Sequence, residues 1–153
     1  MAQALFANQR EANLHSTIAL IEEVLGALGY PATQSRTHDA SSLHAWQIAK
    51  GSATARIALV DRTAFTHIRV TANVMTIDAA VDRAALFAHL LELNAELAGV
   101  AFAAVGDRVL VVCERSTLDI DRSEVQDLIV HVTTTADDHD DALVARFGGR
   151  IGS

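Results

Sequence analysis

The chain contains little cysteine, proline or aromatic residue. One of its 153 residues is cysteine, one is proline, and 5% are aromatic. The single cysteine, Cys113, excludes a disulfide within the chain and a zinc site built from several cysteines. Cys113 ends an apolar run that starts at Val109, so we expect it to be a buried core side chain rather than a reactive thiol.

Long apolar runs are also missing. The longest one, Leu97–Val105, falls far short of the roughly 20 residues that a membrane-spanning helix needs. The N-terminal segment has neither the basic start nor the apolar centre of a signal peptide. We therefore predict a cytoplasmic protein that does not bind membranes.

The sequence also lacks known catalytic motifs. The sequence has no glycine-rich phosphate loop, no G-x-S-x-G elbow and no H-E-x-x-H pair. These absences favour a protein that is not an enzyme and needs no cofactor. The 12 Lys and Arg residues against 19 Asp and Glu residues give a net charge of −7, which repels nucleic acid. We expect a protein or peptide partner instead.

Apolar residues make up 50% of the chain, and they recur along the sequence with two different periods. Where they recur every three or four positions, the pattern predicts helices. The first helix runs from about residue 9 to about residue 28, with Asn8 and Glu11 as a capping box at its start. The second begins at Asp82 and ends before Gly99.

A third helix is predicted from Asp121, where Glu124 completes a second capping box. Its centre, residues 137–141, contains four aspartates, which are poor helix formers, so we expect a weak point or kink there. His131 and His139 lie eight positions apart and cannot ligate one ion from an unbroken helix. We therefore predict no metal site, and whether residues 137–141 bind a cation stays open.

Strands are predicted where apolar and polar residues alternate. Three such segments, around Trp46–Ile48, Ala55–Leu59 and Ile68–Val74, follow a polar loop at residues 33–42 and form an antiparallel meander. We expect Trp46 to be a core residue. The order helix, three strands, helix, two strands, helix predicts an α+β fold, a two-layer antiparallel sheet with helices. One domain is expected over residues 1–153, with its core at about 8–149.

The last two strands, residues 100–105 and 109–113, predict a hairpin around Gly106-Asp107, a pair that suits a type II′ turn. Both faces of this hairpin are apolar, unlike those of the meander. One chain is not expected to cover both faces, so we predict a homodimer that buries the second helix and the hairpin. The residues predicted at this interface are Phe87, Leu91, Phe102, Leu110 and Val112.

The polar face of the meander carries Arg56, His67, Arg69 and Thr71. Basic residues on one sheet face of an acidic protein can form a docking surface for an acidic peptide or anion, although they can also be an ordinary exposed face. An alternative is a small-ligand sensor or an enzyme on the same face, with His67 as the base and Arg69 as the anion anchor.

Three segments resemble the YbjN-domain family of bacterial sensory transduction regulators. The run Leu90–Leu97 before the apolar hairpin resembles the family's second helix, and Ala136–Leu143 followed by Phe147-Gly148-Gly149 resembles its closing helix. Val70–Met75 is similar to its third strand. With the order of elements, the similarity covers about residues 8–149.

This resemblance implies the fold of type III secretion chaperones. It also implies a small acidic domain, often dimeric, that acts by binding protein partners, as a regulator or a chaperone-like adaptor. The family brings no catalytic residues to transfer to this chain.

Overall fold

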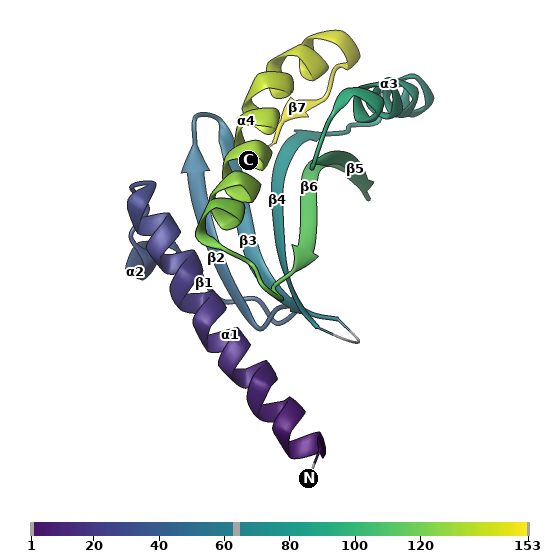
Figure 1. The fold of residues 1–153 in the computed structure, drawn as a ribbon. Helices are drawn as coiled ribbons and strands as arrows, with labels where there is room; N and C mark the ends of the chain where they lie inside the picture. Colours follow the sequence, from purple (N-terminus) through teal and green to yellow (C-terminus); the bar gives the residue numbers. More distant parts are fainter. Residues whose placement is uncertain (1, 63–64, 153) are drawn as a thin grey trace. The chain divides into compact units, whose positions relative to one another are not determined.

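The computed structural model describes residues 2–62 and 65–152, and side chains from Gln9 onward. Helices and strands follow one another as shown in Figure 1. The helices are α1 (Ala2–Ala27), α2 (Ala32–Ser35), α3 (Arg83–Glu96) and α4 (Arg122–Phe147). The strands are β1 (Arg36–Thr37), β2 (His44–Lys50), β3 (Ala53–Asp61), β4 (Thr66–Thr76), β5 (Ala101–Val105), β6 (Arg108–Ser116) and β7 (Arg150–Ile151).

The seven strands form one sheet in the order β1-β2-β3-β4-β6-β5, and β7 pairs with β4. The pairs β1–β2, β5–β6 and β4–β7 are antiparallel. This mixture of helices and an antiparallel sheet confirms the predicted α+β fold class, and the predicted order of the main elements is correct. Short elements absent from the prediction are α2, β1 and β7.

Two local predictions were wrong. The helix expected to start near residue 9 starts at Ala2, so Asn8 lies inside α1 and is not its cap. The segment 33–42, predicted as a loop, contains most of α2 and all of β1. The backbone of this segment forms short-range hydrogen bonds, and two of its residues pair with residues of β2. Neither kind of contact produces a periodic pattern in the sequence.

Two compact units interleave along the chain. The first contains the chain up to Gln47, Ile57–Arg69 and Glu114–Asp127, and the second contains Ile48–Arg56, Val70–Cys113 and the chain from Leu128 onward. The strands β2, β3, β4 and β6 and the helix α4 therefore contribute residues to both units. A single domain over residues 1–153 stays a prediction.

Alternation along β4 shows how the sequence sorts its side chains. Ile68 and Val70 are fully buried, whereas His67 and Arg69, which alternate with them, are half-buried. A period of two places the apolar set on one face of the strand and the polar set on the other. Trp46, fully buried, and Cys113, 6% exposed, are core residues as predicted.

Predicted turns and helix starts are confirmed at three places. The Asp82 side chain accepts hydrogen bonds from the backbone N–H groups of Ala84 and Ala85. Val105 pairs with Arg108, so the β5–β6 loop has two residues, and Gly106 has φ +63°, as the first position of a type II′ turn requires. At the start of α4, Asp121 and Glu124 form the capping box described below.

The helix α4 is unbroken from Arg122 to Phe147, so the aspartates at its centre do not end it. The Ser52 hydroxyl donates to Asp140 Oδ2 at 2.5 Å and lies 3.4 Å from Asp137 Oδ1. The Asp140 carboxylate, only 2% exposed, thus has a hydroxyl donor from the β2–β3 turn. This partner offsets the low helix propensity of aspartate at the centre of α4.

Candidate docking surfaces

Three cationic or ionisable side chains meet at Glu114. The Arg62 guanidinium donates twice to this carboxylate, from Nε to Oε1 at 2.6 Å and from Nη2 to Oε2 at 2.8 Å. Arg69 Nη1 donates to Oε2 at 2.6 Å, and His67 Nδ1 lies 3.3 Å from Oε1. We call Arg62, His67, Arg69 and Glu114 the Glu114 cluster; all four belong to the first unit.

The cluster lies on the sheet face opposite α4. Arg115, the next residue of β6, bonds Glu124 of α4, so Glu114 points to the other face. The Arg62 hydrogen bonds, followed by those of Arg69, lower the Glu114 pKa to about 2 despite the opposing effect of burial. Glu114 is therefore ionised at neutral pH.

Two of the four residues predicted at the docking surface lie in this cluster, His67 and Arg69. Arg56 and Thr71 are half-buried residues of β3 and β4 that belong to the second unit. Sequence reasoning missed Arg62, which lies between the predicted strands around Ala55–Leu59 and Ile68–Val74, and Glu114, because it ended the last strand at Cys113. Continuing the alternation of Leu110 and Val112 by one step would have placed Glu114 on the same face.

Apolar side chains remain uncovered on α3 and the β5–β6 hairpin. Leu91 is 69% exposed and Val105 is 49% exposed, while Phe87, Leu110 and Val112 are half-buried. Phe102 differs from the other residues predicted at the interface, because it is 6% exposed and its ring packs edge-on against His139 at 5.3 Å. The outer hairpin face thus consists of Leu110, Val112 and the alanines of β5 paired with them.

The free edge of β5 is partly closed by the side chain of Asn94 from α3. Asn94 Nδ2 donates to the Phe102 carbonyl at 3.1 Å, and the Phe102 N–H donates to Asn94 Oδ1 at 2.7 Å. This pair of bonds reproduces what a neighbouring strand would offer to Phe102. Backbone pairing by another chain is therefore blocked at this residue.

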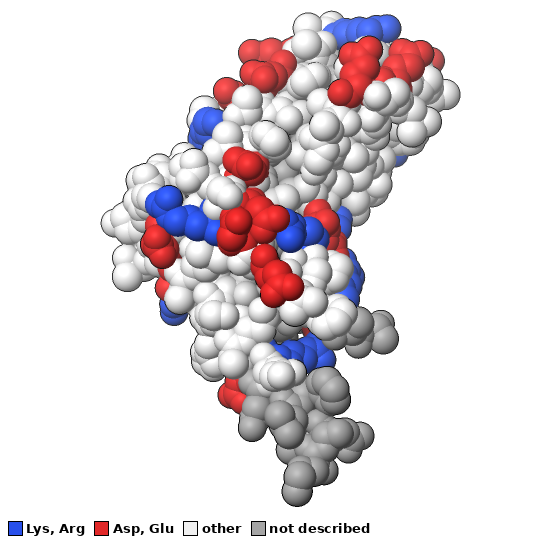
Figure 2. Space-filling view, viewed as in Figure 1, with Lys and Arg blue, Asp and Glu red and all other residues white. Residues whose placement is uncertain are grey.

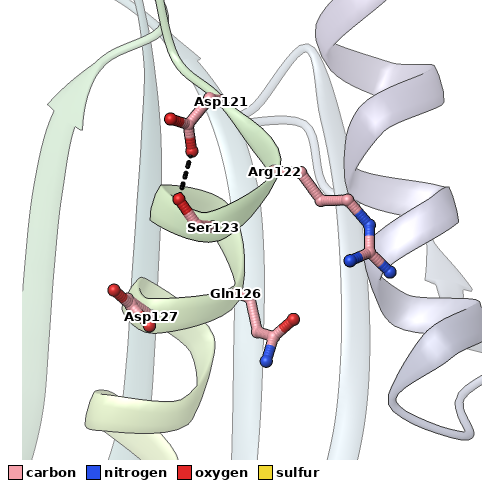
Figure 3. A pocket seen from close by; sticks show the side chains of 5 residues that line it. All are labelled: Asp121, Arg122, Ser123, Gln126 and Asp127. Carbon is pink, nitrogen blue, oxygen red and sulfur yellow. Dashed lines mark hydrogen bonds between the residues drawn. The ribbon is translucent and has the colours of Figure 1, made fainter.

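A shallow pocket of about 360 Å³ lies at the start of α4, lined by Asp121, Arg122, Ser123, Gln126 and Asp127 (Figure 3). The Asp121 carboxylate accepts from the Glu124 N–H at 2.9 Å and from the Ser123 hydroxyl at 2.7 Å, and both bonds lower its pKa. Glu124 Oε2 accepts from the Asp121 N–H at 2.9 Å, which confirms the predicted capping box. The chain's own carboxylate thus occupies these helix-start donors.

Arg122 points from this pocket towards α1, where its Nε donates to Glu23 Oε1 at 3.0 Å (Figure 3). The pocket contains none of the residues predicted as base, anion anchor or docking residue. In the face drawn in Figure 2, basic and acidic side chains lie next to one another around the middle, whereas several acidic side chains elsewhere have no basic neighbour in view.

Metal ligation finds no support among the residues that the structure describes, because no group of three or more His, Cys, Asp or Glu side chains could hold an ion. Of the aspartates in residues 137–141, Asp137 and Asp140 face Ser52 instead. Similarly, none of the described helices is both long and apolar enough to cross a membrane.

Solved structures with a similar fold include two of type III secretion proteins. The ExsC-ExsE complex matches with a TM-score of 0.64 at 15% identity, over 84% of this chain and 94% of that one. The ExoU-SpcU complex of Pseudomonas aeruginosa matches with a TM-score of 0.55 at 13% identity, over 83% and 97%. The Yersinia pestis secretion chaperone SycH, solved with a fragment of YscM2, gives 0.54 at 16%, over 82% and 97%.

Identities this low establish a shared fold and nothing further. No curated protein matches the chain. The family model described as "T3SS (YopN, CesT) and YbjN peptide-binding chaperone 1" matches residues 15–152, which is nearly the whole sequence and agrees with the resemblance seen in the sequence. The chain belongs to this family of type III secretion and YbjN peptide-binding chaperones.

Proposed function

We propose that the protein is a non-enzymatic, chaperone-like adaptor that binds a protein or peptide partner and acts as a homodimer. The match to a peptide-binding chaperone family over residues 15–152 carries this proposal. Similar folds solved in complexes with partner proteins support it. A cytoplasmic location stays a prediction from the sequence.

The proposed dimer interface uses the uncovered apolar side chains of the second unit. Leu91, Leu110, Val112 and Phe87 offer exposed or half-buried apolar surface, while Phe102 supports the hairpin from its buried side. Burying such side chains in a partner copy is favourable by roughly 25 cal/mol per Å². The interface therefore depends on side chains rather than on strand pairing, since Asn94 occupies the β5 edge at Phe102.

Light scattering after size exclusion tests the dimer. We expect about twice the chain mass of 16.3 kDa at tens of micromolar protein. Leu91→Glu combined with Leu110→Glu should give the monomer mass. The matched control is Leu118→Glu, because Leu118 is 51% exposed but belongs to the first unit. A monomeric wild type at this concentration would contradict the proposed homodimer.

Partner docking is proposed at the Glu114 cluster of the first unit, and docking at Arg56 and Thr71 of the second unit stays a prediction from the sequence. The alternative, a small-ligand sensor or enzyme, receives less support, because His67 and Arg69 converge on Glu114 and not on the described pocket. A thermal-shift screen with nucleotides, organic acids and metal ions separates the two. A dose-dependent rise in the unfolding temperature would favour the sensor.

Binding of short, fluorescein-labelled, unstructured peptides tests the function itself. Three sets of peptides are needed that share the same apolar residues. Their polar positions are Glu in the first set, Lys in the second and Gln in the third. Fluorescence anisotropy should show saturable binding of at least one set with a dissociation constant below about 100 µM. If none of the three sets binds with a dissociation constant below about 100 µM, the proposed peptide-binding function is wrong.

A further inference from the structure

The Glu114 cluster contains more cationic donors than its own carboxylate uses. Arg62 engages Glu114 through Nε and Nη2, and Arg69 engages it through Nη1. Within the described residues, Arg62 Nη1 and Arg69 Nε and Nη2 have no hydrogen-bond acceptor. A guanidinium carries five N–H donors in a planar fork, so both side chains can receive a second carboxylate.

Local charge favours an anion here, although the whole chain has a net charge of −7. Two guanidinium groups face one carboxylate in the cluster, which leaves one positive charge without counting His67. The nearby Asp61 is balanced by Arg10 of α1, to which it is bonded. The side chains of Arg62 and Arg69 are 48% and 33% exposed, so a partner can reach them.

Two exposed apolar residues, Phe65 and Leu118, belong to the same end of the sheet as this cluster. The backbone N–H of Arg62 donates to the Phe65 carbonyl at 3.1 Å, which places Phe65 across the β3–β4 turn from Arg62. Phe65 is 48% exposed and Leu118 is 51% exposed. Phe65 directly precedes Thr66, and Leu118 directly follows Thr117. Thr66 and Thr117 are buried and hydrogen-bonded to each other, so Phe65 and Leu118 belong to the same end of the sheet.

This pair of threonines is buried and hydrogen-bonded. The Thr117 N–H donates to the Thr66 carbonyl at 3.0 Å, and the Thr117 hydroxyl lies 2.7 Å from Asn13 Oδ1 of α1. Thr66 and Thr117 are 3% and 1% exposed. Because the backbone beneath Phe65 and Leu118 is hydrogen-bonded and buried, little conformational entropy is lost when a partner binds there.

We propose that this end of the sheet selects an acidic peptide segment. Arg62 and Arg69 receive a carboxylate of the partner beside Glu114, and Phe65 and Leu118 contact an apolar side chain next to that carboxylate in the partner. Glu114 keeps both guanidinium groups oriented and competes with the incoming carboxylate. The inference rests on the proposed peptide-binding function and specifies the chemistry of its partner.

The peptide sets described above test this selectivity, with salt and variants added. The Glu set should bind at least tenfold more tightly than the Gln set and the Lys set, and the preference should weaken as NaCl is raised. Arg69→Gln should weaken binding of the Glu set about tenfold. Arg108→Gln is the matched control, because this substitution removes the same charge. Arg108 is exposed and belongs to the second unit.

Glu114→Gln distinguishes a binding site from a structural brace. Removing one negative charge beside the incoming carboxylate should tighten binding of the Glu set about fivefold. If the cluster only braces the strands, this variant should leave the peptide preference unchanged. Arg69→Lys, which keeps the charge but not the fork, provides an intermediate case if Arg69→Gln fails to fold.

The outcomes separate this inference from the function beneath it. Saturable binding of the Gln or Lys set without preference for the Glu set leaves the peptide-binding function standing and overturns acidic selectivity. Equal weakening by Arg69→Gln and Arg108→Gln would also overturn the site. Tighter binding of single-stranded oligonucleotide than of the Glu peptides would assign the cluster to phosphate instead of carboxylate.

Discussion

The Glu114 cluster and the aspartates of α4 are both rich in charge, but their carboxylates have different partners. Glu114 lies among two arginines and a histidine on a sheet face. Asp140 is buried and accepts from the hydroxyl of Ser52. The first arrangement leaves cationic donors available to a partner, whereas the second is closed by the β2–β3 turn. The number of acidic residues in a segment therefore does not show whether the segment can bind anything.

The β2–β3 turn that covers Asp140 contains Gly51. Substitution of Gly51 should have the largest effect on the free energy of unfolding. Gly51 has φ +60°, and a Cβ there would collide with the Asp137 carboxylate. Asp137 is exposed and its carboxylate can rotate away from the new Cβ, so we expect Gly51→Ala to lower the free energy of unfolding by about 1–3 kcal/mol in urea titration. Gly106→Ala is the matched control, since Gly106 has φ +63° and open space, and should cost only about 1 kcal/mol.

Asp137→Ala should relieve this collision. The double variant Gly51→Ala with Asp137→Ala is expected to recover most of the difference between Gly51→Ala and Gly106→Ala. Equal losses for Gly51→Ala and Gly106→Ala would mean that backbone conformation alone explains the cost.

Ser52→Ala should have nearly as large an effect, a loss of about 1–3 kcal/mol in the free energy of unfolding. It removes a donor from the Asp140 carboxylate, which is 2% exposed. A double-mutant cycle with Asp140→Ala measures the coupling. Asp138→Ala, at an exposed position of the same helix, should change stability by less than about 0.5 kcal/mol.

Glu114 should give a smaller, pH-dependent effect. Its folded-state pKa of about 2 lies below the ordinary value of 4.5, so its stabilisation is present above pH 4.5 and is lost as the pH falls towards 2. We expect the wild type to lose about 1–2 kcal/mol more than Glu114→Gln between pH 6 and pH 3. The comparison cancels contributions from Glu22, Asp121 and Glu124, whose pKa values are also lowered. Parallel pH curves for the two proteins would contradict this assignment.

The smallest effect is expected at the exposed pair of Arg122 and Glu23. Their side chains are 51% and 64% exposed, and exposed ion pairs contribute little. Arg122→Ala should change the free energy of unfolding by less than about 0.5 kcal/mol. A larger loss would show that this pair matters more for stability than its exposure indicates.

Features with local signals could be predicted from the sequence, whereas long-range partners could not. The cap at Asp82, the box of Asp121 and Glu124 and the Gly106 turn each depend on residues within a few positions of one another. Arg62 and Glu114 lie 52 positions apart, and Ser52 and Asp140 lie 88 apart. No period or motif links such residues, because strand pairing and helix packing bring them together only in the fold.

The position of Asn94 has a consequence for how copies of this chain can associate. Its amide satisfies both backbone groups of Phe102, so a neighbouring copy cannot extend the sheet by hydrogen bonding at that residue. The homodimer proposed above therefore relies on side-chain contacts at this residue. Edge-to-edge addition of further copies, which is the route to open-ended fibrils, is disfavoured where the amide occupies the strand edge.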